Sequence, residues 1–487
     1  MRRITILIIN LLLLQQTLYS RNLSPLDYGL SNAKTGIERY YVLLRTHEAA
    51  IERKVGVSYK GIRKLDIEVP SSFNGIPLSE FTDFAGVEIN VKNQSKVGYL
   101  FLLNQQANDI YISKEIFQRG DLKKIPELSC GLKLLIIEDK TPWVKQRRGY
   151  NYGATRRDVI LLKNGRIKNE PVCSYSTSES SPKFSYVSIS KKKKVIKNVT
   201  INRTKDSKYM TFFVRVQNQN NVLLQNITVN TPESELYGDK IFVVYNATNV
   251  VFSDVNINGT YSQSSNFGYG IALDNVWNSR FVRLKTHSNW GIFGNNNVNY
   301  SVLKDCDINR FDVHCYGRDV YCYNTTFRNQ YNQFSSFFGE LVYENCKFSN
   351  FLPVLFESSY FAYTPFDLKF KNCEIELNKD APYLIRAGNL AGQPERKRVE
   401  IDGIAWPNVS MENVTITLPT GVEDLILFNV SGKAEEEVEY LMRINMFNVS
   451  VRSNDSKPRI LLSNRKVRTK NKLDIGISKS SFNDIEL

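Results

Sequence analysis

Histidine is rare in this sequence, which has only three among 487 residues: His47, His287 and His314. The sequence also lacks a compact cluster of Asp and Glu residues of the kind that binds calcium. Its apolar run from Ile4 to Leu14 is too short to cross a bilayer, which takes about twenty apolar residues. These absences disfavour a membrane span and a dedicated calcium site, and they make the position of each histidine informative.

Residues 1–20 have the pattern of a secretory signal. Arg2 and Arg3 precede the apolar run, and a small residue, Ser20, follows a short polar stretch. We therefore expect a signal peptide and an exported protein, located in the periplasm, outside the cell or on its surface.

A nine-residue phrase recurs about ten times between Lys193 and Val451, which is the signature of a solenoid. The phrase has an apolar fourth position, Asn or Asp at the sixth and an apolar ninth, as in Asn221–Val229 (NVLLQNITV). It predicts strand, tight turn and strand, because Asn tolerates left-handed dihedrals and strand side chains alternate. The chain is thus predicted to be all-β, a right-handed parallel β-helix of about ten coils.

Two consequences follow from stacking these coils. The apolar positions should point inward, and the sixth-position residues should form an internal polar ladder of Asn198, Asn226, Asn324, Asn345, Asn372, Asn413 and Asn448. Seven cysteines are present, but Cys306, Cys346 and Cys373 share the seventh position of the phrase. Stacked, buried thiols explain this register better than a disulfide framework does.

We expect one elongated body. Residues 21–185 lack the phrase and should form the N-terminal cap and first coils, with a helix from Gly36 to Ile51. Residues 186–451 should form the β-helix, and residues 452–487 a C-terminal cap or tail laid back along it. Caps are expected because the end of a stacked sheet exposes core and unpaired strand edges.

The net charge of +15 favours a polyanionic partner. Charge attraction does not distinguish phosphate from sulfate or carboxylate, so export shifts the expectation from nucleic acid to an acidic polysaccharide. We expect a monomer that binds this polymer and no nucleic acid.

Four segments of the shortest coils, between Tyr269 and Glu340, are expected to align: Gly270–Asp274, Gly291–Asn295, Asp312–Tyr316 and Gln333–Phe338. This alignment places Ile271, Ile292 and Val313 in one inward column, and a second inward column contains Leu273, Gly294, Cys315 and Phe337. Strand alternation then turns Asp312, His314 and Tyr316 outward together.

His314 is the main catalytic candidate, because histidine is the usual general base near neutral pH. Arg310 and Arg318 at the strand ends are further candidates, and His47 and His287 are expected to be structural. The residues expected to contact substrate on this and adjacent coils are Asp274, Asn289, Trp290, Asn295, Asp312 and Tyr331.

Three segments resemble known proteins. Asp27-Tyr28-Gly29-Leu30, followed by Thr35 and Gly36, resembles the entry segment of pectate-lyase-like β-helices. Arg310–Gly317, followed by Asn324–Phe327, is similar to a coil of exported β-helix polysaccharide lyases of gut Bacteroidetes, and Tyr152–Arg157 extends the likeness. The resemblance implies a lyase that acts on a uronate polymer, a glycosaminoglycan such as chondroitin sulfate or hyaluronan.

For such a β-elimination our hypothesis makes His314 the base and Tyr316 the acid, with no cofactor. Arg310 or Arg318, together with Asn295, would neutralise the substrate carboxylate. A calcium ion would take part only if stacking brought Asp274, Asp312 and Glu340 close enough to bind it. A hydrolase using Asp274 and Asp312 and a non-catalytic glycan-binding β-helix stay open as alternatives, although the Asn-Thr-Asp and paired-Asp motifs of polygalacturonases are absent.

Overall fold

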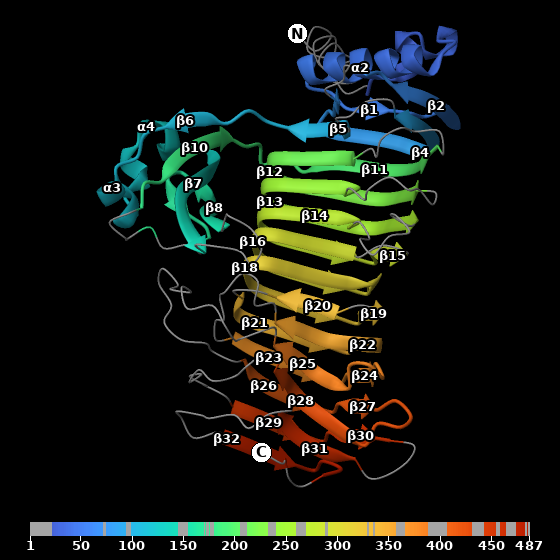
Figure 1. Cartoon of the computed structure of the whole chain (residues 1–487). Coiled ribbons are helices and arrows are strands. Elements are labelled where there is room, and N and C mark those ends of the chain that lie inside the picture. Colours follow the sequence, from blue (N-terminus) through green and yellow to red (C-terminus); the bar gives the residue numbers. More distant parts are fainter. Residues whose placement is uncertain are drawn as a thin grey trace, which may run out of the picture.

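The computed structural model describes residues 22–71, 75–93, 99–144, 154–169, 171, 175, 180–204, 212–231, 240–259, 269–287, 291–328, 331–334, 337–356, 366–387, 407–430, 443–453, 458–463, 474–482 and 485. These residues form a right-handed parallel β-helix with a small domain beside it (Figure 1). The predicted fold class is confirmed. Among the described residues, no helix combines the length and apolar character that a membrane crossing needs.

Each complete coil contains three short strand segments separated by turns. In β12 (Phe212–Thr231) the turns lie at Asn218, Asn221 and Asn226, whose φ angles are 55°, 60° and 51°. The residues between these turns pair in parallel with β13 (Phe242–Gly259). We call the segments at 214–217, 222–225 and 227–231, with their equivalents on other coils, the first, second and third faces.

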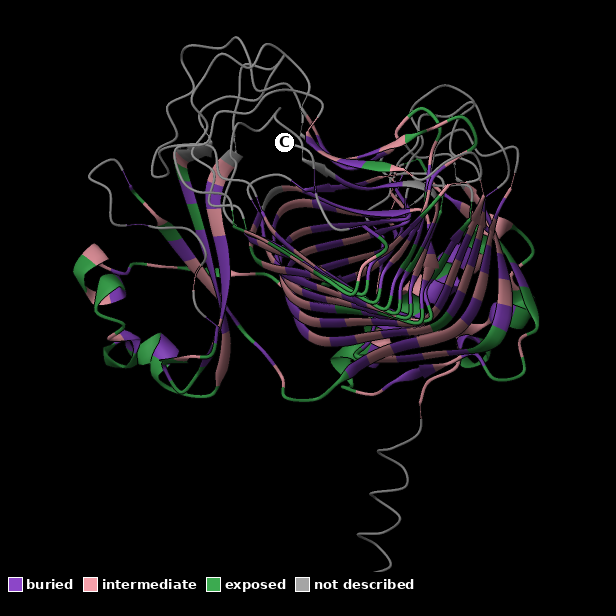
Figure 2. Cartoon of the chain, turned by 90° about the horizontal axis from the view of Figure 1, so that it is seen from below, coloured by how far each residue is buried: buried purple, intermediate pink, exposed green. Residues whose placement is uncertain are grey.

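The apolar positions of the phrase point into the coil, as predicted. Leu224 and Val229, the fourth and ninth positions of one copy, are 0% and 2% exposed. Seen down the axis, buried residues alternate with intermediate ones along the strands of the coils (Figure 2). One contiguous apolar core runs from Leu30 to Ile485 and stabilises the stack.

The N-terminal end of the stack is covered by helix α2 (Gly36–Glu52), close to the bounds that the sequence predicts. Thr35 caps the helix, because its hydroxyl accepts from the Glu38 main-chain N–H and the Glu38 carboxylate accepts from the Thr35 main-chain N–H. The first coils below it contain β1 (Val57–Ser58), β2 (Lys64–Val69), β3 (Ile76–Pro77), β4 (Phe81–Asn93), β5 (Tyr99–Asn104) and β11 (Lys194–Arg203).

The stack then continues to the C-terminal end. Its strands after β13 are β14 (Ile271–Val282), β15 (Lys285–His287), β16 (Gly291–Lys304), β17 (Asp307–Ile308), β18 (Arg310–Tyr323), β19 (Thr326–Arg328), β20 (Tyr331–Phe334), β21 (Phe337–Glu344), β22 (Lys347–Phe356), β23 (Phe366–Lys371), β24 (Glu374–Leu377), β25 (Tyr383–Ala387), β26 (Asn408–Glu412), β27 (Thr415–Thr417), β28 (Asp424–Val430), β29 (Arg443–Phe447), β30 (Ser450–Arg452), β31 (Arg459–Ser463) and β32 (Asp474–Ser478). Strands β31 and β32 pair in parallel with β28 and β29, so the tail extends the stack where a strand laid back along it was expected.

A small domain interrupts the first coils between β5 and β11. It is a five-stranded antiparallel sheet with its own apolar core, and it stands beside the β-helix (Figures 1 and 2). Its elements are β6 (Asn108–Ile110), α3 (Lys114–Gln118), α4 (Pro126–Ser129), β7 (Leu132–Val144), β8 (Ala154–Lys163), β9 (Arg166–Ile167) and β10 (Lys183–Ser188). From the sequence these residues were expected to belong to the N-terminal cap and first coils, and a separate domain was not predicted.

The sixth-position Asn residues form a ladder, which we call the corner ladder, but it is not internal. All of its residues have φ between 50° and 63°. Asn345 donates to Asn324 at 3.1 Å, and Asn372 donates to Asn345 at 3.1 Å. All of these side chains except the half-buried Asn198 are exposed at the corner of the coil. The expectation of an internal ladder is therefore wrong in its location.

The seventh-position thiols are buried and free, as predicted. Cys306, Cys346 and Cys373 are 4%, 2% and 1% exposed, and none is in a disulfide. The Cys346 thiol donates to the Cys322 carbonyl oxygen at 3.3 Å. The thiols thus fill the inside of the turn and satisfy main-chain oxygens there.

Candidate functional site

The first face carries two outward rows of side chains. Parallel pairing aligns the first row, which consists of Arg215, Val243, Ala272, Phe293 and Asp312. The second row contains Tyr245 and Asp274, which pair directly, followed by Asn295 and His314 on the next coils. Neighbouring strands lie about 4.8 Å apart, so each row runs along the axis in steps of that length.

A depression of about 190 Å³ lies over these rows. Its floor is low because the first row has small apolar residues, Val243 and Ala272, at two consecutive positions. Aromatic rings and cations border this floor: the Arg215 guanidinium carbon lies 4.9 Å from the Tyr99 ring centre. The second row contributes polar groups from Tyr245, Asp274 and Asn295. We call this depression the first-face pocket.

Next to the pocket, Arg310 and Asp312 form a buried ion pair. Arg310 Nη2 lies 2.8 Å from Asp312 Oδ2, and the two side chains are 2% and 0% exposed. The Tyr269 hydroxyl donates to the same carboxylate oxygen at 2.5 Å and accepts from Arg310. Burial, then the Asp312 charge, raise the pKa of Tyr269 well above its usual value, so this phenol stays a donor.

Two further contacts fix the buried pair. The Gln333 main-chain N–H donates to Asp312 Oδ1 at 3.0 Å. The Arg310 guanidinium lies over the Tyr331 ring, 4.9 Å from its centre. Gly291, with φ of 95°, permits the close approach of this coil, because a Cβ there would collide with the Arg310 main chain. The absence of a side chain at Gly291 thus lets its coil pack closely against the main chain of Arg310.

His314 lies between this pair and the pocket. Its Nε2 is 3.8 Å from Asp312 Oδ2, and its side chain is 12% exposed. Its ring meets the Phe293 ring edge-on with centres 4.6 Å apart. Phe293 stacks on Tyr269, also at 4.6 Å, and Lys240 Nζ lies 5.5 Å from the Phe293 ring centre. Phe293 therefore links the histidine to the wall of the pocket.

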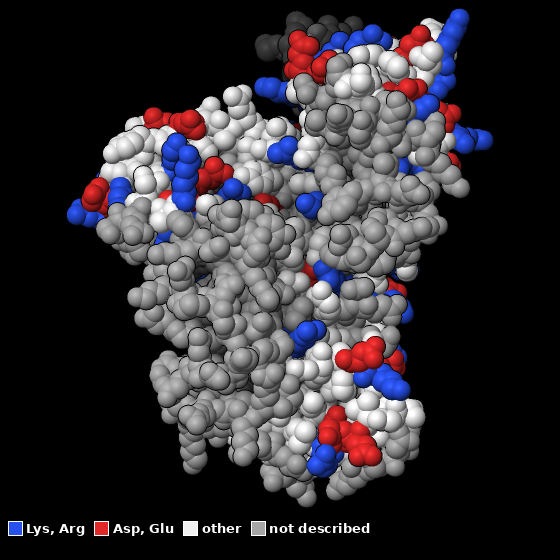
Figure 3. All heavy atoms as spheres, viewed as in Figure 1, with Lys and Arg blue, Asp and Glu red and all other residues white. Residues whose placement is uncertain are grey.

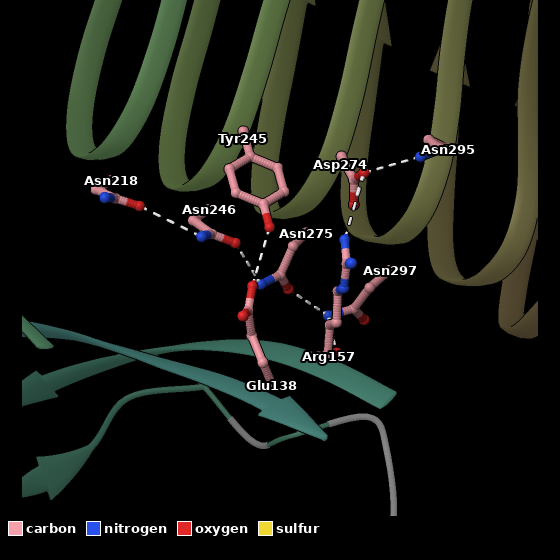
Figure 4. A network of polar contacts seen from close by, with 9 residues as sticks. All are labelled: Glu138, Arg157, Asn218, Tyr245, Asn246, Asp274, Asn275, Asn295 and Asn297. Carbon is pink, nitrogen blue, oxygen red and sulfur yellow. Dashed lines mark hydrogen bonds and ion pairs between the residues drawn. The ribbon is translucent and has the colours of Figure 1, made fainter. Parts of the chain in front are cut away.

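The small domain contacts the second row directly. Tyr245 donates its hydroxyl to Glu138 of β7 at 3.0 Å, and Arg157 of β8 lies 3.8 Å from Asp274 (Figure 4). Asn295 donates to Asp274 at 2.8 Å. Burial raises the pKa of Asp274, although Asn295 and Arg157 oppose the shift. Asp274 therefore holds its proton more readily than an exposed carboxylic acid does.

A second asparagine ladder docks the small domain. It consists of Asn218, Asn246, Asn275 and Asn297 at the turns after the first face, and all four side chains are buried (Figure 4). Asn218 donates to the Gln105 carbonyl at 2.8 Å, where the chain leaves for the small domain. Asn297 donates to the Arg157 carbonyl at 2.7 Å. We call this series the docking ladder, because its first and last residues bond the β-helix to the main chain at the two sides of the small domain.

The structure aligns Asp274, Asn295 and His314 in one row of the first face and places Asp312 in the neighbouring row. The detailed alignment was wrong by two residues, since Val313 pairs with Gly294, and Phe311 occupies the column of Ile292. Gly317, not Cys315, aligns with Phe337.

The expected surface exposure of Arg310 and Asp312 was wrong, because their mutual ion pair and the Tyr269 and Tyr331 rings enclose them. Arg318 is 40% exposed, and its Nε lies 3.3 Å from Asp319. His47 is buried against Tyr59, whereas His287 is exposed at the end of β15. The side chain of Tyr316, and all of Asn289 and Trp290, lie outside the described residues.

Sequence reasoning missed the residues that border the pocket, namely Tyr99, Arg215, Lys240, Tyr245 and Phe293. The available signal was an alternation of apolar inward residues with polar or aromatic outward ones over 214–217 and 242–245, upstream of the segments that were considered. On the face drawn in Figure 3, Lys and Arg side chains recur along the length of the β-helix.

A metal cluster is not formed by the described residues, which contain no group of three or more His, Cys, Asp or Glu side chains close enough to hold an ion. Asp274, Asp312 and Glu340 in particular do not form such a group. Glu340 instead pairs with Lys369 and accepts from Tyr321.

Comparison with family models and with curated proteins finds no match. Solved structures show the likeness in fold. The Gp54 tailspike of Acinetobacter baumannii bacteriophage AP22 has a TM-score of 0.50 and 9% sequence identity, over 91% of this chain and 77% of that chain. The tailspike protein gp49 from Pseudomonas phage LKA1 has a TM-score of 0.49 and 10% identity, over 91% and 81%. At 9% identity the likeness to the AP22 tailspike concerns the fold alone, and the class of fold is the parallel β-helix.

Proposed function

We propose that the protein binds an acidic polysaccharide along the first face and cleaves it by β-elimination, as a polysaccharide lyase. The position of His314 carries the proposal. This partly exposed imidazole lies on the coil next to Asn295 of the pocket and packs edge-on against Phe293, which also lines the pocket; the buried Arg310–Asp312 pair lies beside it. Histidine is the usual general base near neutral pH, and this one faces outward on the first face.

The reaction starts at a uronic acid. The base removes the C5 proton, the electrons of that bond form a C4–C5 double bond, and the C4–O bond breaks as an acid protonates the leaving oxygen. His314 acts as the base in this proposal, and Tyr316 as the acid. Arg318 and Asn295 face the developing carboxylate charge, and the step uses no cofactor.

Other observations support a polysaccharide partner. The chain carries a net charge of +15, which attracts uronate and sulfate groups. The AP22 tailspike, which shares the fold, is described in complex with a capsular saccharide of A. baumannii. An exported location and a glycosaminoglycan substrate, such as chondroitin sulfate or hyaluronan, belong to the same proposal.

A screen of soluble acidic polysaccharides tests the function. We expect ultraviolet absorbance of an unsaturated uronide to rise with at least one uronate polymer, and a chelator to leave the rate unchanged. A new reducing end without unsaturation would identify a hydrolase. Retention without cleavage would identify a binding protein.

Hydrolysis is the second candidate, and Asp274 favours it. Its pKa is raised by burial, as a general acid requires, and it lies in the pocket. Its expected partner Asp312 is enclosed and ion-paired, so it cannot activate water at the surface. Glu138, which accepts from Tyr245 beside Asp274, would have to supply the second carboxylate.

A further inference from the structure

The first-face pocket contains two cations that are held by aromatic rings. Arg215 lies over Tyr99, with 4.9 Å between guanidinium carbon and ring centre, and Lys240 lies over Phe293 at 5.5 Å. Within the described part of the chain, neither cation has a carboxylate within 4.0 Å, although most exposed cations of the third face do. Among these described residues no close ion pair neutralises either cation, although Lys240 also acts on Asp274 from beyond ion-pair distance, so both cations can contribute to binding an anion.

The space between these cations suits a sugar chain. Arg215 and Phe293 are separated by three strand steps in one row, roughly 14 Å at the usual spacing. Val243 and Ala272 keep the floor between them low, and the Tyr99 and Phe293 rings stand at its ends. Tyr245, Asp274 and Asn295 along one side offer hydroxyl, carboxyl and amide groups to sugar hydroxyls.

We propose that Arg215 and Lys240 form a subsite for a negatively charged sugar residue, which binds through its carboxylate or sulfate group. The inference rests on the proposed function, because it takes the polymer to run along the first face toward His314. Phe293 connects the proposed subsite with the proposed base, since its ring contacts Lys240 in the pocket and also contacts His314. Binding of a charged sugar in the subsite would thus determine which sugar residue of the polysaccharide lies next to His314.

Binding of defined polymers to the Arg215→Gln/Lys240→Gln variant tests the subsite. The matched control is Lys285→Gln/Lys304→Gln, which removes the same charge from exposed positions on the other faces. Hyaluronan offers carboxylates alone, dextran sulfate offers sulfates alone, chondroitin sulfate offers both, and dextran offers neither. Calorimetry in a His314→Ala background measures dissociation constants while limiting cleavage.

We expect the subsite variant to bind at least one charged polymer about tenfold or more weakly, because each charge-assisted contact contributes on that order. The control should change affinity by less than about twofold, since distant exposed charges act weakly through solvent. A loss confined to hyaluronan assigns a carboxylate, and a loss confined to dextran sulfate assigns a sulfate. Circular dichroism and the melting temperature confirm that the variants are folded.

Three outcomes would overturn the subsite: unchanged affinity in the subsite variant, equal weakening in the control, or no binding of any charged polymer by the wild type. The outcome for the lyase is separate. Wild-type binding that depends on Arg215 and Lys240, without an unsaturated product, leaves the subsite standing and removes the lyase proposal. Formation of an unsaturated product together with unchanged affinity in the subsite variant supports the lyase proposal and removes the subsite.

Discussion

Arg310 and Asp312 form an ion pair that is almost completely removed from solvent, with 2.8 Å between Nη2 and Oδ2. A pair of this kind contributes little net stability, but removing one partner leaves the other charge buried alone. We expect Asp312→Asn to destabilise the protein by about 3–5 kcal/mol, measured by urea unfolding. The double variant Arg310→Met/Asp312→Leu should recover much of that loss, and a double variant as unstable as the single one would contradict this account.

His314 gives the second prediction. His314→Ala should lower the rate of unsaturated product formation by about 10²–10⁴-fold, the usual contribution of a general base, while the melting temperature changes little. His287→Gln is the control, because His287 is exposed at the end of β15 on the third face. Full activity in His314→Ala would remove this residue from the base role.

The corner ladder predicts a difference between two substitutions at Asn345, whose φ is 54°. Asn345→Ala places a Cβ-bearing residue without a polar side chain in a left-handed turn, which costs about 1–2 kcal/mol. It also removes bonds to Asn324 and Asn372, each contributing about 1 kcal/mol. Asn345→Gly loses the bonds but keeps the turn, so its unfolding midpoint should lie between those of the wild type and the alanine variant.

His47 predicts acid sensitivity of the N-terminal cap. Burial lowers the pKa of His47 to about 3 from 6.5, so the folded state keeps the ring neutral while the unfolded state protonates it. The stabilising contribution is complete above about pH 6.5 and falls by about 1.4 kcal/mol per pH unit as the pH drops toward 3. His47→Gln should reduce this slope in urea unfolding between pH 7 and 4, and an unchanged slope would contradict the assignment.

The repeat made most of the fold predictable. The sixth-position Asn residues mark turns correctly because only Asn, Asp and Gly adopt left-handed dihedrals readily, so the sequence encodes their position locally. The buried fourth and ninth positions follow from strand alternation. Whether a turn's side chain points to solvent depends on the path of the neighbouring coil, and this long-range information was not available for the corner ladder.

The site was less predictable for the same reason. His314 and Asp274 were found because their strand parity faces outward, yet burial of Arg310 and Asp312 depends on Tyr269 and Tyr331, which belong to other coils. Arg215 and Lys240 lie 99 and 74 positions before His314 in the chain, and only the stack brings them near it. A local sequence pattern shows which side of a strand a residue faces. Whether that residue is buried, and what shape the pocket has, depends on packing between coils.

The two asparagine ladders have opposite consequences for how this chain can change length. Within the run of the corner ladder from Asn324 to Asn448, an inner residue such as Asn372 both donates to and accepts from a like neighbour, so a whole added coil carrying its own asparagine would rejoin the series. The docking ladder instead runs between two anchors, the carbonyls of Gln105 and Arg157. A coil inserted between β5 and β16 would move the small domain away from one of these carbonyls. Duplication of a coil is therefore disfavoured in that stretch and tolerated after β18.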